Sequence, residues 1–286
     1  MKLSVVVLTM GNRPAELDRA VDSALNQKDV EVEVVLVGNG ADVPGIWPDA
    51  VKVVRLPENV GIPAGRNRGA EASSGEIIVF LDDDGWYESG TLGAHLRDLF
   101  TDDPALGIVS FRVRDPEGGP GERRHVPRLR AGDPLRSSEV TTFLGGACAI
   151  RRVAFEAAGG LPEDFFYAHE ETDLAWQVLN AGYRIVYDSD SVMFHPALPP
   201  TRHEMFYRLN ARNRVWLARR NLPWPVAFVY LCIWVGMTVA RERNPAALRP
   251  WFGGFREGWR RPAGPRRPIS WRTVLRMTRL GRPPVI

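Results

Sequence analysis

The sequence predicts an α/β fold built around a mostly parallel, doubly wound sheet. Short apolar runs rich in β-branched residues alternate with helical patterns, and the connections between them are short. Polar residues follow two of these runs, after Val37 and after Leu81. Ligands bind such sheets beyond the carboxyl ends of the strands. The polar residues after Val37 and Leu81 lie at these ends, so this edge of the sheet is predicted to bind a ligand.

The first predicted strands and helices have clear boundaries. Asn12 is expected to cap the first helix, with Pro14 in its first turn. The predicted elements are a strand at 5–8, a helix with its apolar face on Leu17, Ala20, Val21, Ala24 and Leu25, strands at 32–37 and 51–56, a short helix carrying Arg66, Asn67, Arg68 and Gly69, and a strand at 77–81 between Gly75 and Gly85.

The next hundred residues continue the alternation. A helix is predicted near 89–100, a strand at 107–113, a strand and turn over 141–150, a short helix ending at Gly159-Gly160, a helix from about Thr172 to Asn180 with Gly182 as its stop, a strand at 183–187, and a run at 192–194 that leads to His195. Residues 115–136 are rich in Pro, Gly and Arg and have no periodicity. A loop of this length is expected to be a lid or binding loop.

Three carboxylates, Asp82, Asp83 and Asp84, end the strand at 77–81. Like charges so close repel, and a divalent cation would cancel the repulsion. In an extended chain Asp82 and Asp84 point to the same side, so they are expected to hold one hard cation together with diphosphate oxygens. The alternative is an acidic turn or helix N-cap ahead of Glu88 and Ser89.

A second acidic group follows the aromatic residues at 165–167. Acids in the first turn of a helix suit the helix dipole, which is a structural explanation for one or two of Glu170, Glu171 and Asp173. A site at this position is the functional alternative. A lone His after an apolar run, such as His195, is more often structural than a ligand.

Length and composition indicate one large domain, or one domain with an appendage. Cys148 and Cys232 lie in apolar runs and are expected to be reduced core thiols. The N-terminal run at 3–8 is interpreted as a first strand rather than a signal peptide. Residues 241–286 hold twelve Arg and two acids, a charge of +10, which leaves about −7 for residues 1–240 of a chain whose net charge is +3. Such a tail suggests an anionic surface partner.

The last quarter of the chain is predicted to be a helical, membrane-associating extension over 201–286. It begins with a basic helix at 202–220. The apolar segment at 222–240 would span ~28 Å as a helix, just short of a ~30 Å bilayer core. It is therefore a spanning helix, an in-plane or re-entrant membrane helix, or a buried core helix. Arginines on both sides favour a helix that dips into one leaflet at the cytoplasmic face of the cell membrane.

The tail that follows mixes aromatic and basic residues. These are Trp251, Phe252, Phe255, Trp259 and Trp271 with Arg256, Arg260, Arg261, Arg266, Arg267 and Arg272. The mixture suits anionic lipid headgroups. The alternative is a solvated, partly disordered tail, and nucleic acid is not expected as the partner because the body of the chain is acidic.

Residues 3–196 together resemble family 2 glycosyltransferases, which have the GT-A fold. The resemblance rests on motifs in the family's order and on the closing His195. These motifs are the opening strand and turn at 7–13, the loop at 37–42, the segment with Asn59, Gly61, Arg66, Asn67 and Gly69, the Asp-x-Asp of Asp82 and Asp84, and 170–174 ahead of Gly182, Tyr183 and Arg184. The resemblance implies a catalytic domain at 1–200.

The resemblance also implies site residues. Glu171 would be the catalytic base; Thr9, Asn12, Arg13, Asn39, Arg66, Asp82 and Asp83 would bind the nucleotide-sugar; Gly145, Gly146, Glu170 and Asp173 would lie on the acceptor side; and Asp84, Asp82 and His195 would bind Mn²⁺ or Mg²⁺. Two departures matter. Gly38 stands where many relatives have an Asp that contacts the base, and the usual Glu-Asp pair is Glu170-Glu171.

The implied activity is an inverting, metal-dependent transfer of a hexosyl or deoxyhexosyl group from a nucleotide-diphospho-sugar to a hydroxyl. The acceptor would be a glycan or a lipid-linked molecule in cell-envelope synthesis. One alternative is a catalytically degenerate, membrane-associated scaffold, supported by Gly38 and the Glu-Glu pair. A nucleotidyltransferase is less expected, because the loop at 10–14 is too poor in Gly for its phosphate-binding role.

Overall fold

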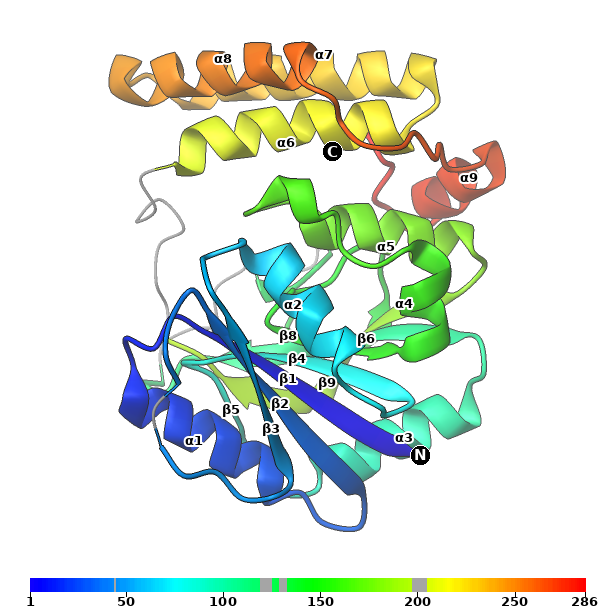
Figure 1. Cartoon of the computed structure of the whole chain (residues 1–286). Helices are drawn as coiled ribbons and strands as arrows, with labels where there is room; N and C mark the ends of the chain where they lie inside the picture. The colour runs from blue at the N-terminus through cyan, green and yellow to red at the C-terminus, as the bar shows by residue number, and fades with distance from the viewer. Residues whose placement is uncertain (44, 119–124, 129–132, 197–204) are drawn as a thin grey trace.

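The computed structural model describes residues 1–43, 45–118, 125–128, 133–196 and 205–286. A nine-stranded sheet forms its centre, with helices on both faces and a layer of further helices above one of them (Figure 1). The predicted α/β class with a mostly parallel sheet is confirmed.

The sheet has a parallel half and a mixed half, in the order β3-β2-β1-β4-β8-β6-β9-β5. The parallel half consists of β1 (Lys2–Thr9), β2 (Glu31–Asn39), β3 (Val51–Leu56) and β4 (Ile77–Asp82). In the mixed half, β8 (Ala147–Arg151) runs antiparallel between β4 and β6 (Leu106–Arg114), and β9 (Arg184–Phe194) runs parallel to β6. The short strands β5 (Trp86–Tyr87) and β7 (Ser138–Glu139) pair with β9.

Alternate residues of each strand face two separate hydrophobic clusters, as the pleat requires. Val5 and Val7 of β1 face α1 (Pro14–Leu25) and α3 (Leu92–Asp102). Val6 faces the opposite side, where α2 (Ile62–Glu71), α4 (Arg152–Ala158) and α5 (Glu170–Asn180) lie (Figure 1). Both faces are covered, which explains why the strands are continuous apolar runs.

Several predicted boundaries differ from the structure. Asn12 is not the cap of α1: Arg13 takes the N-cap position, its side chain makes no capping hydrogen bond, and Pro14 is the first helical residue. The helix α5 starts at Glu170 rather than Thr172, and β9 is one strand over both predicted runs. In the predicted loop at 115–136, residues 119–124 and 129–132 lie outside the described part of the chain.

The described part of the C-terminal extension consists of four helices and the segments that connect them. It comprises α6 (Phe206–Asn221), α7 (Trp224–Arg241), α8 (Pro245–Arg260) and α9 (Trp271–Arg279). The predicted start of its basic helix, 202–204, lies outside the described residues. The tail is not a solvated, disordered segment, because α8 packs along α6: a Cβ on Gly254 would lie 2.0 Å from the carbonyl oxygen of Arg208.

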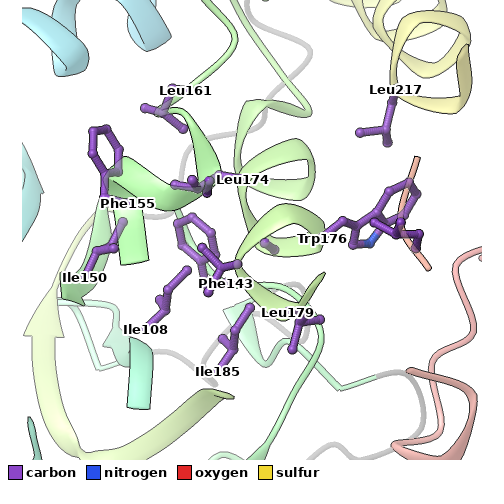
Figure 2. Packing of buried hydrophobic residues seen from close by; sticks show 14 of the residues in the cluster. Ile108, Phe143, Ile150, Phe155, Leu161, Leu174, Trp176, Leu179, Ile185 and Leu217 are labelled. Atoms are coloured by element: carbon purple, nitrogen blue, oxygen red, sulfur yellow. The ribbon is translucent and has the colours of Figure 1, made fainter. Parts of the chain in front are cut away.

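The extension shares a hydrophobic core with the sheet domain. Leu174 and Trp176 of α5, Leu217 of α6 and Val274 of α9 are buried in one cluster. Figure 2 shows Trp176 and Leu217 on facing elements of this cluster. The predicted boundary at residue 200 stays a prediction, and the core runs across it.

Candidate active site

The predicted site residues meet at the carboxyl edge of the parallel strands. Leu8 of β1 lies beside Asp82 of β4 in the parallel register, so Thr9 and Asp83 continue from neighbouring strand ends. The turn before β8 brings Gly145 and Gly146, the end of β9 brings His195, and the first turn of α5 brings its two glutamates.

Two adjoining cavities occupy this edge. One, of about 550 Å³, is lined by Thr9, Asn12, Arg13, Asn39 and the three aspartates at 82–84, among others. The other, of about 400 Å³, is lined by Gly145, Gly146, Glu170 and Glu171, among others. Arg66, Asp82 and His195 line both cavities, which therefore form two lobes of one cleft. We call the first the donor lobe and the second the acceptor lobe, after the roles that the sequence analysis predicts for their residues.

Asp82, Asp84 and His195 form a group with the geometry of a metal site. One ligand atom from each lies within 4.8 Å of the others. The Nε2 atom of His195 is 3.1 Å from Oδ1 of Asp84 and 3.8 Å from Oδ2 of Asp82. Two carboxylates and one imidazole are a donor set that Mn²⁺ accepts. The predicted residues therefore fit a divalent cation.

The reason for this convergence differs from the prediction. β4 ends at Asp82, and the chain then turns, with the amide of Gly85 donating to the carbonyl of Asp82 at 3.0 Å. Asp82 and Asp84 are thus brought together by a turn and not by an extended strand. Burial lowers the pKa of His195, but its hydrogen bond to Asp84 and the charge of Asp82 outweigh burial and raise that pKa.

The two glycines before β8 allow the acidic groups to lie against the backbone. A Cβ on Gly146 would be 2.0 Å from Oδ2 of Asp82. A Cβ on Gly145 would be 2.4 Å from Oε1 of Glu171 and 2.6 Å from Nη1 of Arg66. Any side chain at either position would displace a residue of the site.

Thr9, Arg13 and Asp83 form a polar network on the donor side. The hydroxyl of Thr9 donates to Asp83 at 2.8 Å, and the guanidinium of Arg13 contacts both Asp83 and Asp84. Burial raises the pKa of Asp83, and the charges of Asp84 and Asp82 add to that effect. This network places the positive guanidinium of Arg13 and the hydrogen-bond-accepting carboxylate oxygens of Asp83 in the donor lobe.

Asn39 lines the donor lobe, but its amide is already engaged. Its Nδ2 donates to Asn59 and to the carbonyl of Gly61, and its Oδ1 accepts from the amide of Val60. Asn39 therefore holds the loop at 59–61. At Gly38 a Cβ would lie 2.4 Å from the carbonyl oxygen of Ala41, so the fold has no room there for the base-contacting side chain of many relatives.

The acceptor lobe contains a buried pair of glutamates beside an arginine. Glu170 is 2% exposed, and burial and the neighbouring Glu171 raise its pKa well above 4.5. Burial also raises the pKa of Glu171, while Arg66 and a hydrogen bond from Glu170 oppose the rise. Burial and charge therefore favour the neutral form at Glu170 more strongly than at Glu171.

Arg66 connects the glutamates to the metal-type group. Its Nη2 donates to Asp82 at 2.8 Å, and its Nη1 lies 4.0 Å from Oε1 of Glu170. Burial opposes its charge, but the nearby carboxylates outweigh burial and raise its pKa. A guanidinium at this position also faces the donor lobe, where it can contact a phosphate.

Asp173 does not belong to the acceptor lobe. It is 3% exposed, and its Oδ1 accepts from Nε of Arg220 at 2.9 Å and from Asn221 at 2.6 Å. The prediction of an acceptor-side role for this residue is corrected by its position: one helical turn beyond Glu170, it points into the contact between α5 and α6 and ties the two helices together.

Other residues that line the cleft were not predicted from the sequence. Met205, Phe206 and Leu209, at the start of the extension, border the two lobes, and His125 and His169 line the acceptor lobe. The aromatic residues at 165–167 mark the loop that carries His169, so the sequence held a local indication of this part of the cleft. Residues 205–209 carry no such local signal, because only the tertiary fold brings them to the cleft.

Solved structures show that this arrangement is the GT-A fold. Staphylococcus aureus TarS 1-349 in complex with UDP-GlcNAc aligns with a TM-score of 0.62 at 16% identity, covering 96% of this chain and 83% of that one. The mannosyltransferase PcManGT from Pyrobaculum calidifontis, in complex with GDP-Man and Mn²⁺, aligns with a TM-score of 0.56 at 17% identity, covering 98% and 72%. The likeness shows that this chain has the same fold as these two solved structures.

The chain belongs to glycosyl transferase family 2, whose sequence profile matches residues 4–159. It is 27% identical over 234 residues to the pre-mycofactocin glycosyltransferase of Mycobacterium tuberculosis, covering 75% of this chain and 44% of that protein. It is 26% identical over 268 residues to the N-acetylglucosaminyl-diphospho-decaprenol L-rhamnosyltransferase of the same species, covering 78% and 86%. This chain spans less than half the length of the first of these relatives.

Proposed function

We propose that this glycosyltransferase moves a sugar from a nucleotide-diphospho-sugar to an acceptor hydroxyl with inversion at the anomeric carbon, and that it requires a divalent cation. One observation carries the proposal: Glu171 and the group of Asp82, Asp84 and His195 line one cleft, with Arg66 between them. A proton acceptor and a cation site on two sides of one cavity match the demands of a direct displacement.

Asp82, Asp84 and His195 would hold the cation, Mn²⁺ or Mg²⁺. When bound, it would neutralise the charge that develops on the leaving nucleoside diphosphate. The solved structure of PcManGT contains Mn²⁺, which supports this choice. Thr9 and Arg13 border the donor lobe, where they would contact the nucleotide.

On the other side of the cleft, Glu171 would accept the proton of the attacking hydroxyl. Arg66 beside it and its hydrogen bond with Glu170 favour the charged form of Glu171, against burial, which raises its pKa. The hydroxyl would then attack the face of the anomeric carbon opposite the diphosphate, which yields inversion. General-base assistance of this kind typically contributes ~10²–10⁴-fold to the rate.

A thermal-shift panel of UDP-, GDP- and dTDP-sugars, with and without Mn²⁺, tests the proposal. We expect one donor class to raise the melting temperature only when Mn²⁺ is present, and Asp84→Ala to remove that increase. A donor that stabilises the protein equally with EDTA, or equally in the Asp84→Ala variant, would contradict the cation requirement. The matched variant Asp98→Ala, on the exposed face of α3, should bind the donor normally.

We further propose that the extension docks on the anionic cytoplasmic face of the cell membrane, where the acceptor would be lipid-linked. Within the described residues, one helix, α7, is long and apolar enough to cross a membrane, and 22% of it is buried. Its exposed side chains include Trp224 at 57% and Phe228 at 71% exposure. The name of the rhamnosyltransferase relative specifies a diphospho-decaprenol acceptor, which supports a lipid-linked class.

Two contacts favour an in-plane position for α7 over a spanning one. The hydroxyl of Tyr230 lies 3.2 Å from Nη1 of Arg214 in α6, and the guanidinium of Arg214 lies 3.3 Å from the ring centre of Trp234. One side of α7 therefore contacts α6, which itself packs on the sheet domain. The apolar side chains opposite these contacts are available to lipid.

The neighbouring helix α8 presents the charge that such a surface needs. Phe252 and Trp259 are exposed and alternate with the exposed Arg256 and Arg260. α7 and α8 both lie on the side of α6 remote from the sheet (Figure 1), and residues of both helices line one pocket there. Arginines interleaved with aromatics at helical spacing match an anionic headgroup layer.

Cosedimentation with vesicles tests this docking. We expect binding to phosphatidylglycerol-containing vesicles and little binding to pure phosphatidylcholine, with loss of binding in the double variant Arg256→Glu, Arg260→Glu. The double variant Lys52→Glu, Arg55→Glu on the edge strand β3 makes the same charge change far from α8 and should bind like the wild type. Equal loss in both variants, or no binding by the wild type, would contradict the docking face.

A further inference from the structure

The loop that leads into the catalytic helix has an unusual backbone. Phe166, Ala168 and His169 have φ values of 63°, 69° and 71°. This left-handed region favours glycine, and none of the three is glycine. Glu170 and Glu171 follow directly as the first residues of α5. The loop at 164–169 is therefore in a conformation that its own residues disfavour, and it needs support from elsewhere.

Support comes from hydrogen bonds to every carbonyl from residue 164 to residue 168. Arg212 donates through Nη2 to the carbonyls of Asp164 at 3.1 Å and Phe165 at 2.8 Å. Asn213 places its Nδ2 within 2.8–2.9 Å of the carbonyls of Phe165, Tyr167 and Ala168. The amide of Ile62 donates to the remaining carbonyl, that of Phe166, at 2.8 Å.

The two side chains on α6 are themselves fixed. Asn213 is fully buried, and its Oδ1 accepts from Nε of Arg212 at 2.9 Å, which sets the orientation of its amide. The guanidinium of Arg212 lies 4.2 Å from the ring centre of Trp216 and 3.8 Å from Glu257 of α8. A buried amide left without partners is costly, so this arrangement resists local rearrangement.

We propose that Arg212 and Asn213 are positioning residues for the catalytic carboxylates. By holding the carbonyls of the loop, they set the start of α5 and hence the place of Glu171 in the acceptor lobe. The tolerance at that place is small, because Gly145 leaves no space for displacement on one side. The C-terminal extension is on this view part of the active site. The inference rests on the proposed role of Glu171 as the base.

The same loop also borders the donor lobe. Its bond to Ile62 joins it to the first residue of α2, the helix that carries Arg66, and a Cβ on Gly61 would lie 2.6 Å from the carbonyl oxygen of Phe166. The residues proposed to contact the nucleotide, Thr9 and Arg13, lie at the sheet edge, and Asn213 makes no hydrogen bond to either of them. Loosening the loop should therefore reduce turnover far more than donor affinity.

Asn213→Leu, an almost isosteric change that removes the donor group, tests the proposal in the full-length chain. We expect the turnover number to fall about 10- to 100-fold, in line with the effect of a displacement near 1 Å on a catalytic group. The dissociation constant of the donor with Mn²⁺ should change less than threefold. Amides of 164–170 should exchange hydrogen faster than in the wild type.

Leu217→Ala is the matched control, because Leu217 is fully buried on the same helix and belongs to the apolar core. It should lower the melting temperature without lowering turnover at temperatures well below the transition. If Asn213→Leu does not fold, Arg212→Lys keeps the charge opposite Glu257 while losing the two-pronged contact, and turnover should fall about 5- to 10-fold.

The outcomes separate the two proposals. Turnover and loop exchange that are the same in Asn213→Leu as in Leu217→Ala would overturn the positioning role. A wild-type protein that binds no nucleotide-sugar would instead contradict the proposed function. In that case faster exchange at 164–170 in Asn213→Leu alone would still support the hold of α6 on the loop.

Discussion

The same substitution at the two adjacent glutamates of the acceptor lobe should lower turnover by very different amounts. In the structure Glu170 is 2% exposed, and burial beside Glu171 raises its pKa well above 4.5, which favours its neutral form. Gln at this position is also neutral and retains a donor toward Glu171. We expect Glu170→Gln to lower turnover by less than about threefold, a barrier change of ~0.6 kcal/mol.

Glu171→Gln removes the proton acceptor while keeping the shape of the side chain. The expected loss is ~10²–10⁴-fold, which corresponds to a barrier increase of ~3–5 kcal/mol. Donor affinity should stay nearly unchanged, because the residues of the donor lobe are unaltered. The two variants carry the same substitution at adjacent residues, yet their rates should differ by orders of magnitude.

Release of the nucleoside diphosphate in the presence of Mn²⁺, measured at saturating donor, gives the turnover number, and calorimetry gives donor affinity. Comparable losses in both variants would refute the assignment of charge within the pair. A large loss confined to Glu170→Gln would exchange the two roles. Equal losses of turnover and donor affinity in Glu171→Gln would refute its role as the base.

Three further predictions follow from the contacts described above. Gly146→Ala places a Cβ 2.0 Å from Oδ2 of Asp82 and should weaken Mn²⁺-dependent donor binding at least tenfold, whereas Gly253→Ala, with open space around it, should not. Because the base must be ionised and burial raises the pKa of Glu171, kcat/KM should fall as the pH drops through a value above 4.5; an acidic limb at or below pH 4.5 would contradict this. Partial burial opposes ionisation of Glu33, but hydrogen bonds from Ser4, Ser74 and Lys2 lower its pKa to about 2. The stability that Glu33 provides should be fully present above pH 4.5 and lost as the pH falls toward 2, so urea unfolding should show Glu33→Gln to be ~1 kcal/mol less stable than the wild type at pH 7, after allowance for screening, and equal to it at pH 2.

Much of the sheet domain was predictable because its signals are local. The strand at 51–56 and the apolar face of the helix that begins at Pro14 follow from periodicity alone. The acidic residues after Leu81 stood out because three like charges at a strand end have no packing explanation. Most residues of the cleft were then predicted from the motifs of the family. Thr9, Arg66 and Glu171 do line the cavities at the sheet edge.

The errors arose where a residue's role depends on a distant partner. Asp173 shares the acidic pattern of its neighbours, yet Arg220 and Asn221 draw it into a helix contact about fifty positions along the chain. The departure from the family at Gly38 stands, and the structure adds its reason: Ala41 and Val43 occupy the space that a side chain would need there.

By itself, the sequence determined the class of fold, the edge of the sheet that binds ligand, and the acidic groups that gather there, because strand and helix periodicity and strand-end chemistry are written within a few neighbouring residues. Only the tertiary structure decided how burial and neighbouring charges distinguish Glu170 from Glu171. Whether a glutamate is protonated, or a left-handed loop is stable, depends on burial and on donors such as Asn213, which lies 42 residues beyond Glu171. That information exists only once the chain has folded.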